Sequence, residues 1–96
     1  QSITADASSQ VANVTSAVTE INTTSSTGAI SLADGSDGQI KIFINTSTSN
    51  TNNVVITPTN LRGGTTVTLN AQGETAVCIF KNSNWNVIGG HGFVVA

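Results

Sequence analysis

Charged side chains are scarce in this 96-residue chain. They make up 8% of it, against about 25% in an average soluble domain. The cations are Lys41, Arg62 and Lys81, which are far apart in the sequence, and the formal net charge is -2. Proteins that bind nucleic acids neutralise phosphates with clustered lysines and arginines. The charge content therefore argues against a nucleic-acid partner.

Cysteine and long apolar runs are also nearly missing. A single cysteine excludes a disulfide within the chain. Cys78 lies in the apolar run AVCIF, and free cysteines are among the most buried residue types, so we predict a buried and unreactive thiol. No apolar run approaches the roughly 18 residues that a membrane-spanning segment needs. We therefore expect no membrane partner.

Small polar and β-branched residues take the place of the missing charges. The chain has 11 Ser, 15 Thr and 11 Asn, and its Val, Ile and Thr residues together number 34. β-Branched residues favour strands over helices. The length allows one small domain, whose own core gives a thin margin of stability. Such a composition is typical of β proteins found outside cells or on particle surfaces.

Turn residues divide most of the chain into short apolar segments. Their spacing of roughly 8–12 residues, without any β-α-β rhythm, predicts an all-β fold, an antiparallel sandwich or jelly-roll-like domain over residues 18–96. The loop at 46–53 is polar. Pro58 ends the strand that follows this loop, at residues 53–57. The eight strands expected are residues 18–23, 29–32, 39–45, 53–57, 65–69, 75–81, 85–89 and 93–96.

The segment QIKIFIN has the clearest strand pattern. Its apolar side chains alternate, so that Ile40, Ile42 and Ile44 share one face of the strand. Lys41, Phe43 and Asn45 then share the other face.

Residues 1–17 are rich in Ser, Ala, Thr and Gln and hold only scattered valines. We expect them to form an extended N-terminal arm or a strand, able to lie over a neighbouring subunit and become ordered on binding. A helix is the alternative, because Val11, Val14, Val18 and Ile21 follow the spacing of a coiled-coil seam. That repeat covers two heptads and includes poor helix formers.

The stretch LADGSDGQIKIF contains Asp34 and Asp37 among glycines. An EF-hand loop beginning at Asp34 would need a bidentate Glu at its twelfth position, where this chain has Asn45. The spacing therefore fails for that motif, although a weaker calcium site at the two aspartates stays open. We interpret the stretch as a corner in which Gly35 and Gly38 supply positive φ and the aspartates bond to nearby backbone.

Other chemical groups carry no recognisable motif. The acids are Asp6, Glu20, Asp34, Asp37 and Glu74. We assign no catalytic, cofactor-binding or metal-ligating residues, and we expect no cofactor and no enzymatic activity. Trp85 is interpreted as a core residue sharing a side with Val87, or alternatively as an exposed ring that stacks on sugars. His91 is expected at the surface or near a threefold axis, where three copies could hold a metal.

The order of several segments resembles a β-rich module of tailed-bacteriophage virion proteins. The pattern D-G-x-x-G-Q-x-K corresponds to residues 34–41, and the I-T-P break to residues 56–58. A T-x-T-L strand, a Gly-Glu turn, an apolar strand and a W-x-V-I-G ending follow at residues 66–69, 73–74, 76–80 and 85–89. The resemblance covers about residues 28–92.

This resemblance implies a homotrimer located in a virion, and it carries over no catalytic residues. Such modules occur as capsid decoration (cement) proteins, which bind the major capsid protein on the outer surface of the head. They also occur in tail or head fibres that touch a host receptor such as a glycan. A chain of 96 residues has no room for a fibre shaft, so we expect a decoration protein. Its location would be the capsid outer surface, after assembly in the host cytoplasm.

Overall fold

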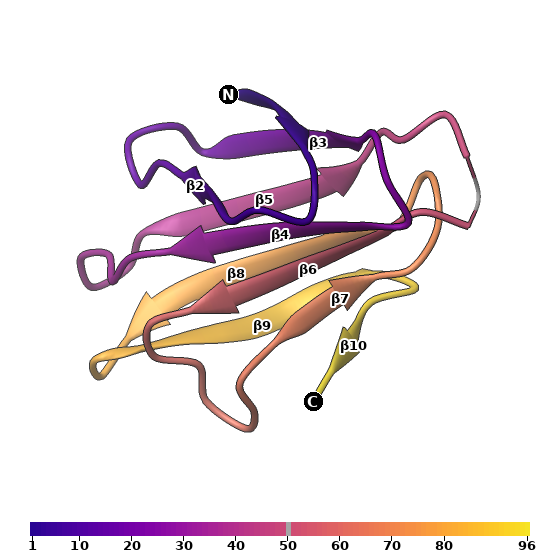
Figure 1. The fold of residues 1–96 in the computed structure, drawn as a ribbon. Coiled ribbons are helices and arrows are strands. Elements are labelled where there is room, and N and C mark those ends of the chain that lie inside the picture. The colour runs from indigo at the N-terminus through magenta and orange to yellow at the C-terminus, as the bar shows by residue number, and fades with distance from the viewer. Residues whose placement is uncertain (50) are drawn as a thin grey trace.

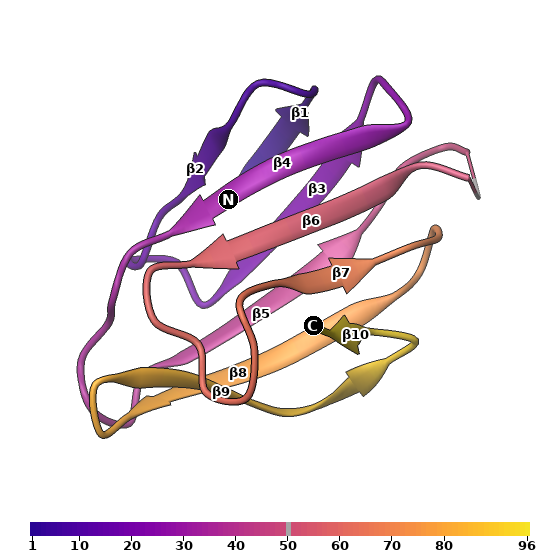
Figure 2. The same ribbon diagram turned by 60° about the horizontal axis from the view of Figure 1, so that its bottom comes forward.

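The computed structural model describes residues 1–49 and 51–96, and all regular structure in them is β. Ten strands form two five-stranded sheets that pack against each other (Figures 1 and 2). Sheet A has the order β1-β3-β5-β8-β9, and sheet B has the order β10-β7-β6-β4-β2. The prediction of an all-β fold is confirmed.

Strand bounds agree with the sequence prediction from residue 18 onward, to within a few residues. The strands are β1 (Ser2–Ala5), β2 (Gln10–Ala12), β3 (Val18–Thr23), β4 (Thr27–Leu32), β5 (Ile40–Asn45), β6 (Asn53–Pro58), β7 (Val67–Leu69), β8 (Thr75–Lys81), β9 (Asn84–His91) and β10 (Val94–Val95). Residue 50, in the polar loop predicted at 46–53, lies outside the described residues.

The first six strands wind as three coils, because the chain crosses to the opposite sheet between each of these strands and the next. As a result β1, β3 and β5 run parallel in sheet A, and β2, β4 and β6 run parallel in sheet B. Ser2 lies beside Glu20, and Glu20 lies beside Ile44, one coil apart each time. Parallel neighbours require a crossover, and here a strand of the other sheet provides it. The predicted purely antiparallel, jelly-roll-like arrangement is therefore wrong, and both sheets are mixed.

The second half of the chain closes the structure with antiparallel strands. In sheet A, β8 pairs with β5 and β9 pairs with β8, whereas in sheet B β7 pairs with β6 and β10 pairs with β7. A tight hairpin joins β8 to β9, as predicted. Its two central residues, Asn82 (φ 52°) and Ser83 (φ 63°), have the positive φ values of a primed turn.

The segment expected to be an N-terminal arm, residues 1–17, contributes a strand to each sheet. β1 and β2 are the edge strands next to β3 and β4, so the described β structure begins at Ser2 rather than at residue 18. The Gln1 side chain joins the two sheets at this end. Its Nε2 atom donates to the Val11 carbonyl at 3.3 Å, and its Oε1 atom accepts from Thr19 Oγ1 at 2.9 Å. These contacts hold the segment that was expected to extend outward.

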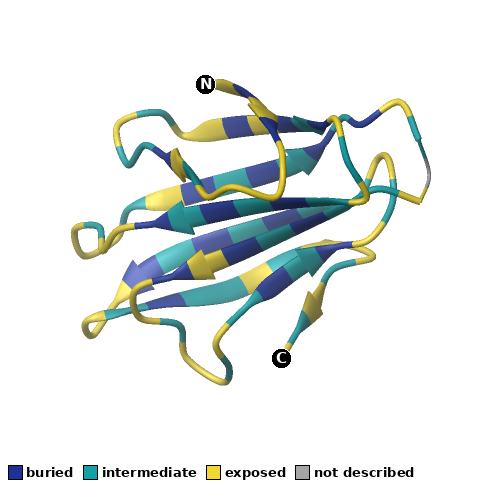
Figure 3. Cartoon of the chain, in the orientation of Figure 1, coloured by how far each residue is buried: buried dark blue, intermediate teal, exposed yellow. Residues whose placement is uncertain are grey.

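The core lies between the sheets, where buried residues alternate with more exposed ones along most of the strands (Figure 3). Its apolar members are Ile3, Ala5, Ala12, Ile21, Ile30, Leu32, Phe43, Val54, Ile56, Val67, Leu69, Ala76, Cys78, Phe80 and Trp85. Isoleucine is the most frequent of them, in keeping with the preference of β-branched residues for a pleated sheet surface.

Strand β5 points its isoleucines away from this core. The predicted alternation is confirmed, but it is Lys41, Phe43 and Asn45 that are fully buried, at 0–1% exposure. The strand therefore turns a lysine and an asparagine toward the core, and its three isoleucines lie on the outer face of sheet A. A shift of one residue in register would turn the isoleucines toward the core and the other three side chains toward the outer face.

Hydrogen bonds explain how polar side chains are accommodated at one internal corner. Asn45 Nδ2 donates to the Asn52 and Leu69 carbonyls, at 3.1 Å each, and Asn45 Oδ1 accepts from the Ser47 amide at 3.0 Å. The Ser47 hydroxyl in turn accepts from the Thr23 amide at 2.9 Å. Buried polar groups cost little when they are bonded in this way. The network therefore fixes the end of β5 in its observed orientation.

Candidate functional site

The loop with Asp34 and Asp37 lies over one end of the two sheets. Asp34 Oδ2 accepts a hydrogen bond from Asn60 Nδ2 at 2.8 Å. Asp37 forms an exposed ion pair with Lys81 at 3.4 Å. Each carboxylate thus contacts a side chain from a different distant segment, rather than sharing one centre. Within the described residues, no group of three or more His, Cys, Asp or Glu side chains is placed to hold a metal ion.

The two glycines of this loop have different roles. Gly38 has φ 86°, as predicted, and occupies the turn that leads into β5. Gly35 is absent from the positive-φ positions, so that part of the prediction is wrong. A Cβ atom at Gly35 would lie 2.9 Å from Cζ2 of Trp85. The backbone at this position approaches the indole ring too closely for a larger residue.

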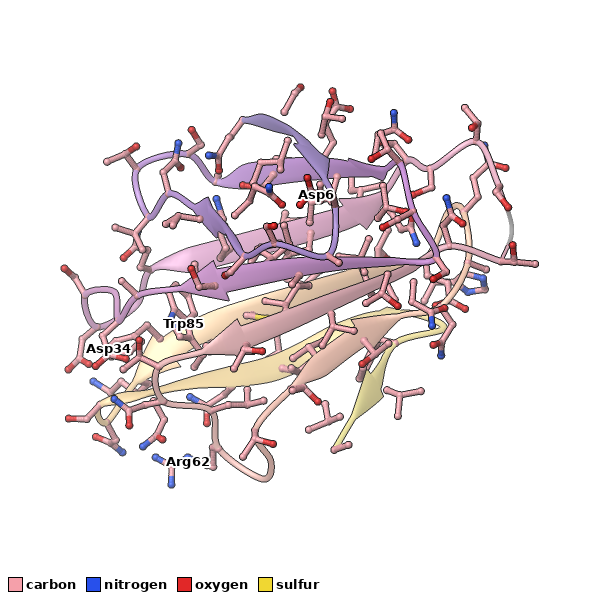
Figure 4. The ribbon with its side chains drawn as sticks, viewed as in Figure 1. Asp6, Asp34, Arg62 and Trp85 are labelled. Atoms are coloured by element: carbon pink, nitrogen blue, oxygen red, sulfur yellow. The ribbon has the colours of Figure 1, made fainter. Side chains whose placement is uncertain are left out.

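Trp85 is fully buried beneath that loop, at 0% exposure. Its Nε1 atom donates to the Ala33 carbonyl at 2.9 Å, and its ring contacts Phe80 edge to face with centroids 5.2 Å apart. Figure 4 shows Trp85 and Asp34 at the same end of the molecule. The interpretation of Trp85 as a core residue is confirmed, and Val87 packs against the same core. Its ring is not accessible for stacking on a sugar.

Cys78 and His91 lie in opposite environments. Cys78 is buried, as predicted, and burial raises the pKa of its thiol to about 11. The thiolate that would act as a nucleophile is therefore disfavoured. His91 is exposed at the end of β9, where its backbone amide donates to Thr75 Oγ1 at 3.1 Å. Its predicted surface position is confirmed.

Lys41 is the one cation that the strand pattern places in the core. Its Nζ atom donates to the Ser16 carbonyl at 2.8 Å and lies 5.7 Å from the centre of the Phe43 ring. Loss of water around the ammonium group lowers the pKa of Lys41 from 10.5. A carbonyl and an aromatic face compensate a buried charge less completely than a carboxylate would.

The outer face of sheet A is the largest feature that sequence reasoning missed. Its side chains form cross-strand rows: Val18, Ile42 and Val77 lie beside one another, and Ile40 lies beside Ile79. Ile88 on β9 is 59% exposed, Ile40 is 37% exposed and Val18 is 41% exposed. Five of the nine isoleucines of the chain lie on this face, namely Ile40, Ile42, Ile44, Ile79 and Ile88. We call these five, with Val18 and Val77, the isoleucine face.

The outer face of sheet B differs in chemistry. Its central row runs from Val94 through Thr68 and Val55 to Ala29. The neighbouring row joins Val11 and Ser31 to Thr57. Small and hydroxyl-bearing side chains therefore alternate with valines on this face, and it has no isoleucine. The molecule thus presents two broad and chemically unlike surfaces.

Comparison of the chain with protein-family models and with curated proteins found no match. The described residues contain no helix that is both long enough and apolar enough to cross a membrane.

Proposed function

We propose that this protein is a structural component of a bacteriophage virion, a trimeric capsid decoration (cement) protein that stabilises the head. Its partners would be further copies of itself and the major capsid protein, on the outer surface of the capsid. It would pass through the host cytoplasm during assembly. In this role it has no catalytic activity and needs no cofactor.

The observation that carries this proposal is the pair of unlike outer faces. A cement protein must make two kinds of contact, one with its own copies and one with the shell. Sheet A offers the isoleucine face, and sheet B offers a surface of Thr, Ser, Ala and Val. Few charges interrupt either face, which makes contacts less dependent on salt. The resemblance of residues 28–92 to virion modules supports the same role.

The proposal is tested on particles produced with and without the chain. We expect particles that lack it to release their genome at a lower temperature, or after a milder osmotic shock, than complete particles. Adding back the purified protein should restore the resistance. Equal resistance of the two preparations would refute the cementing role. A reconstruction of the complete particle should then show density for the chain above the capsid shell.

The fibre alternative, in which the chain binds a host glycan, has weaker support. Trp85, the ring that would stack on a sugar in this alternative, is fully buried. A glycan receptor would have to be held mainly by polar loops. Specific binding to a glycan array, together with loss of host adsorption after loop replacement, would favour this alternative over cementing.

A further inference from the structure

We infer that the isoleucine face of sheet A is the surface through which copies of this chain bind one another. The occupant of the face is thus a second copy of the same chain. The inference rests on the proposed function only for its expectation of a trimer. It adds which surface makes the contact.

The first argument is the orientation of β5. Burying a residue such as isoleucine contributes roughly 1.5–3 kcal/mol, whereas burying a lysine ammonium has a cost. An isolated sheet would therefore be expected to turn Ile40, Ile42 and Ile44 inward. The observed strand instead buries Lys41 and Asn45 together with Phe43. This choice is favourable overall when the outward isoleucines are also removed from water by a partner.

The second argument is size. The isoleucine face extends over four strands, β3, β5, β8 and β9, each about 4.8 Å from the next and close to 20 Å long. Its area in projection is therefore roughly 400 Å², and the accessible area of its side chains is larger. The largest apolar patch on a typical monomer covers about 300–600 Å² and is often functional. The face alone is smaller than the ~800 Å² that each partner contributes to a standard interface, so its polar border would also take part in the contact.

The third argument is charge, and it favours a second copy over a charged partner. The central rows, Val18-Ile42-Val77 and Ile40-Ile79, carry no charge, so two identical faces meet without repulsion. Charges lie at the border. Glu20 is beside Ile44 at one end of the strands, and Lys81, paired with Asp37, lies beyond Ile79 at the other end.

The experiment measures the mass of the purified chain in solution over a concentration series, by sedimentation velocity or light scattering. We expect the wild-type chain to be an oligomer. Ile42→Lys places a charge at the centre of the isoleucine face and should raise the dissociation constant roughly 30-fold or more, as for a central interface residue. Val55→Lys is the matched control, because Val55 is half-buried and points outward from the middle of β6 in sheet B. It should leave the association unchanged.

Folding of each variant is checked by the fluorescence of Trp85, the only tryptophan, which is enclosed in the core away from both outer faces. If Ile42→Lys does not fold, Ile42→Thr replaces it. Threonine keeps the β-branched shape while removing apolar surface, and it should weaken association by a smaller factor.

A wild-type chain that stays monomeric at about 100 µM, well above the Kd range of stable interfaces, would overturn the inference. So would folded Ile42 variants that associate normally, or an equal loss of association in Val55→Lys. A monomer that still protects particles from heat would overturn this inference while leaving the cementing role standing. An oligomer that dissociates with Ile42→Lys but gives particles no protection would support this inference and refute the cementing role.

Discussion

The indole nitrogen of Trp85 donates a hydrogen bond to the carbonyl oxygen of Ala33, across 52 residues of sequence and at 2.9 Å. This bond attaches the loop before β5 to the hairpin strand β9. It also satisfies the polar atom of a buried side chain whose ring packs against Phe80. The loop that first suggested an ion site is thus positioned by a tryptophan underneath it.

Replacing Trp85 with Phe should lower the free energy of unfolding by about 2 kcal/mol or more, because the Ala33 carbonyl loses its donor and a cavity remains. Urea unfolding followed by circular dichroism measures the loss, since the fluorescent side chain is removed. Phe93→Leu, at a half-buried position near the end of the chain, serves as the control and should cost less. Equal stability of Trp85→Phe and the wild type would show that the bond contributes nothing.

Asp34 and Asp37 should not form a calcium site, because their carboxylates contact Asn60 and Lys81 separately. We expect millimolar calcium to leave the melting temperature of the purified protein unchanged. The double variant Asp34→Asn, Asp37→Asn should melt at nearly the wild-type temperature and still assemble. A calcium-dependent rise in the wild type that disappears in the double variant would establish a site.

Lys41 should make the protein more stable as the pH rises toward 10.5. The pKa of Lys41 is lowered in the folded state by burial, from 10.5. Between the lowered value and 10.5 the unfolded chain binds more protons than the folded chain, so stability increases with pH in that window. Lys41→Met should remove this increase, and the matched exposed variant Lys81→Met should keep it. Urea unfolding at a series of pH values measures both.

Cys78 should make the protein less stable as the pH rises, which is opposite to the effect of Lys41. Its pKa is about 11 in the folded protein and 9.0 for an unperturbed thiol, so the unfolded chain loses its proton first. Stability should therefore fall as the pH rises from 9 to 11, by roughly 2–3 kcal/mol in total. Cys78→Ala should abolish this fall, although the smaller side chain also lowers stability at every pH.

The same thiol offers a second measurement. A thiol reagent added to the native protein near pH 8 should react slowly with Cys78, and should react rapidly after unfolding in urea. Rapid reaction of the native protein would contradict the buried position.

The sequence was sufficient to predict the strands from residue 18 onward. Turn residues such as Gly38, Pro58 and the Asn82-Ser83 pair interrupt β-branched segments, and these signals are local. The same local signals were weak before residue 18. β1 and β2 are only four and three residues long, and they contribute only Ile3, Ala5 and Ala12 to the core.

The parallel pairing could not be predicted, because it depends on which sheet each strand enters. A strand such as β3 has the same alternation whether it returns antiparallel in one sheet or crosses to the other. The inward face of β5 was undetermined for a related reason. Its isoleucines are the more apolar set, but Phe43 fits between the sheets and Asn45 bonds to three backbone groups at the corner.

The isoleucine face could therefore not be predicted from the sequence. Ile42 and Val77 are 35 positions apart and become neighbours only through the pairing of β5 with β8. No motif marks them, since each belongs to an ordinary strand pattern. Only after the direction of β5 is known does the set of outward isoleucines become a contiguous face.

The coiled first half has a consequence for how such a protein can change length. Each coil adds one strand to both sheets and leaves the antiparallel closing strands untouched. Duplication or loss of one whole coil, such as β1 with β2, would widen or narrow the molecule in steps of one strand. One coil is therefore the unit by which this fold can change in width without any change in how the domain is closed.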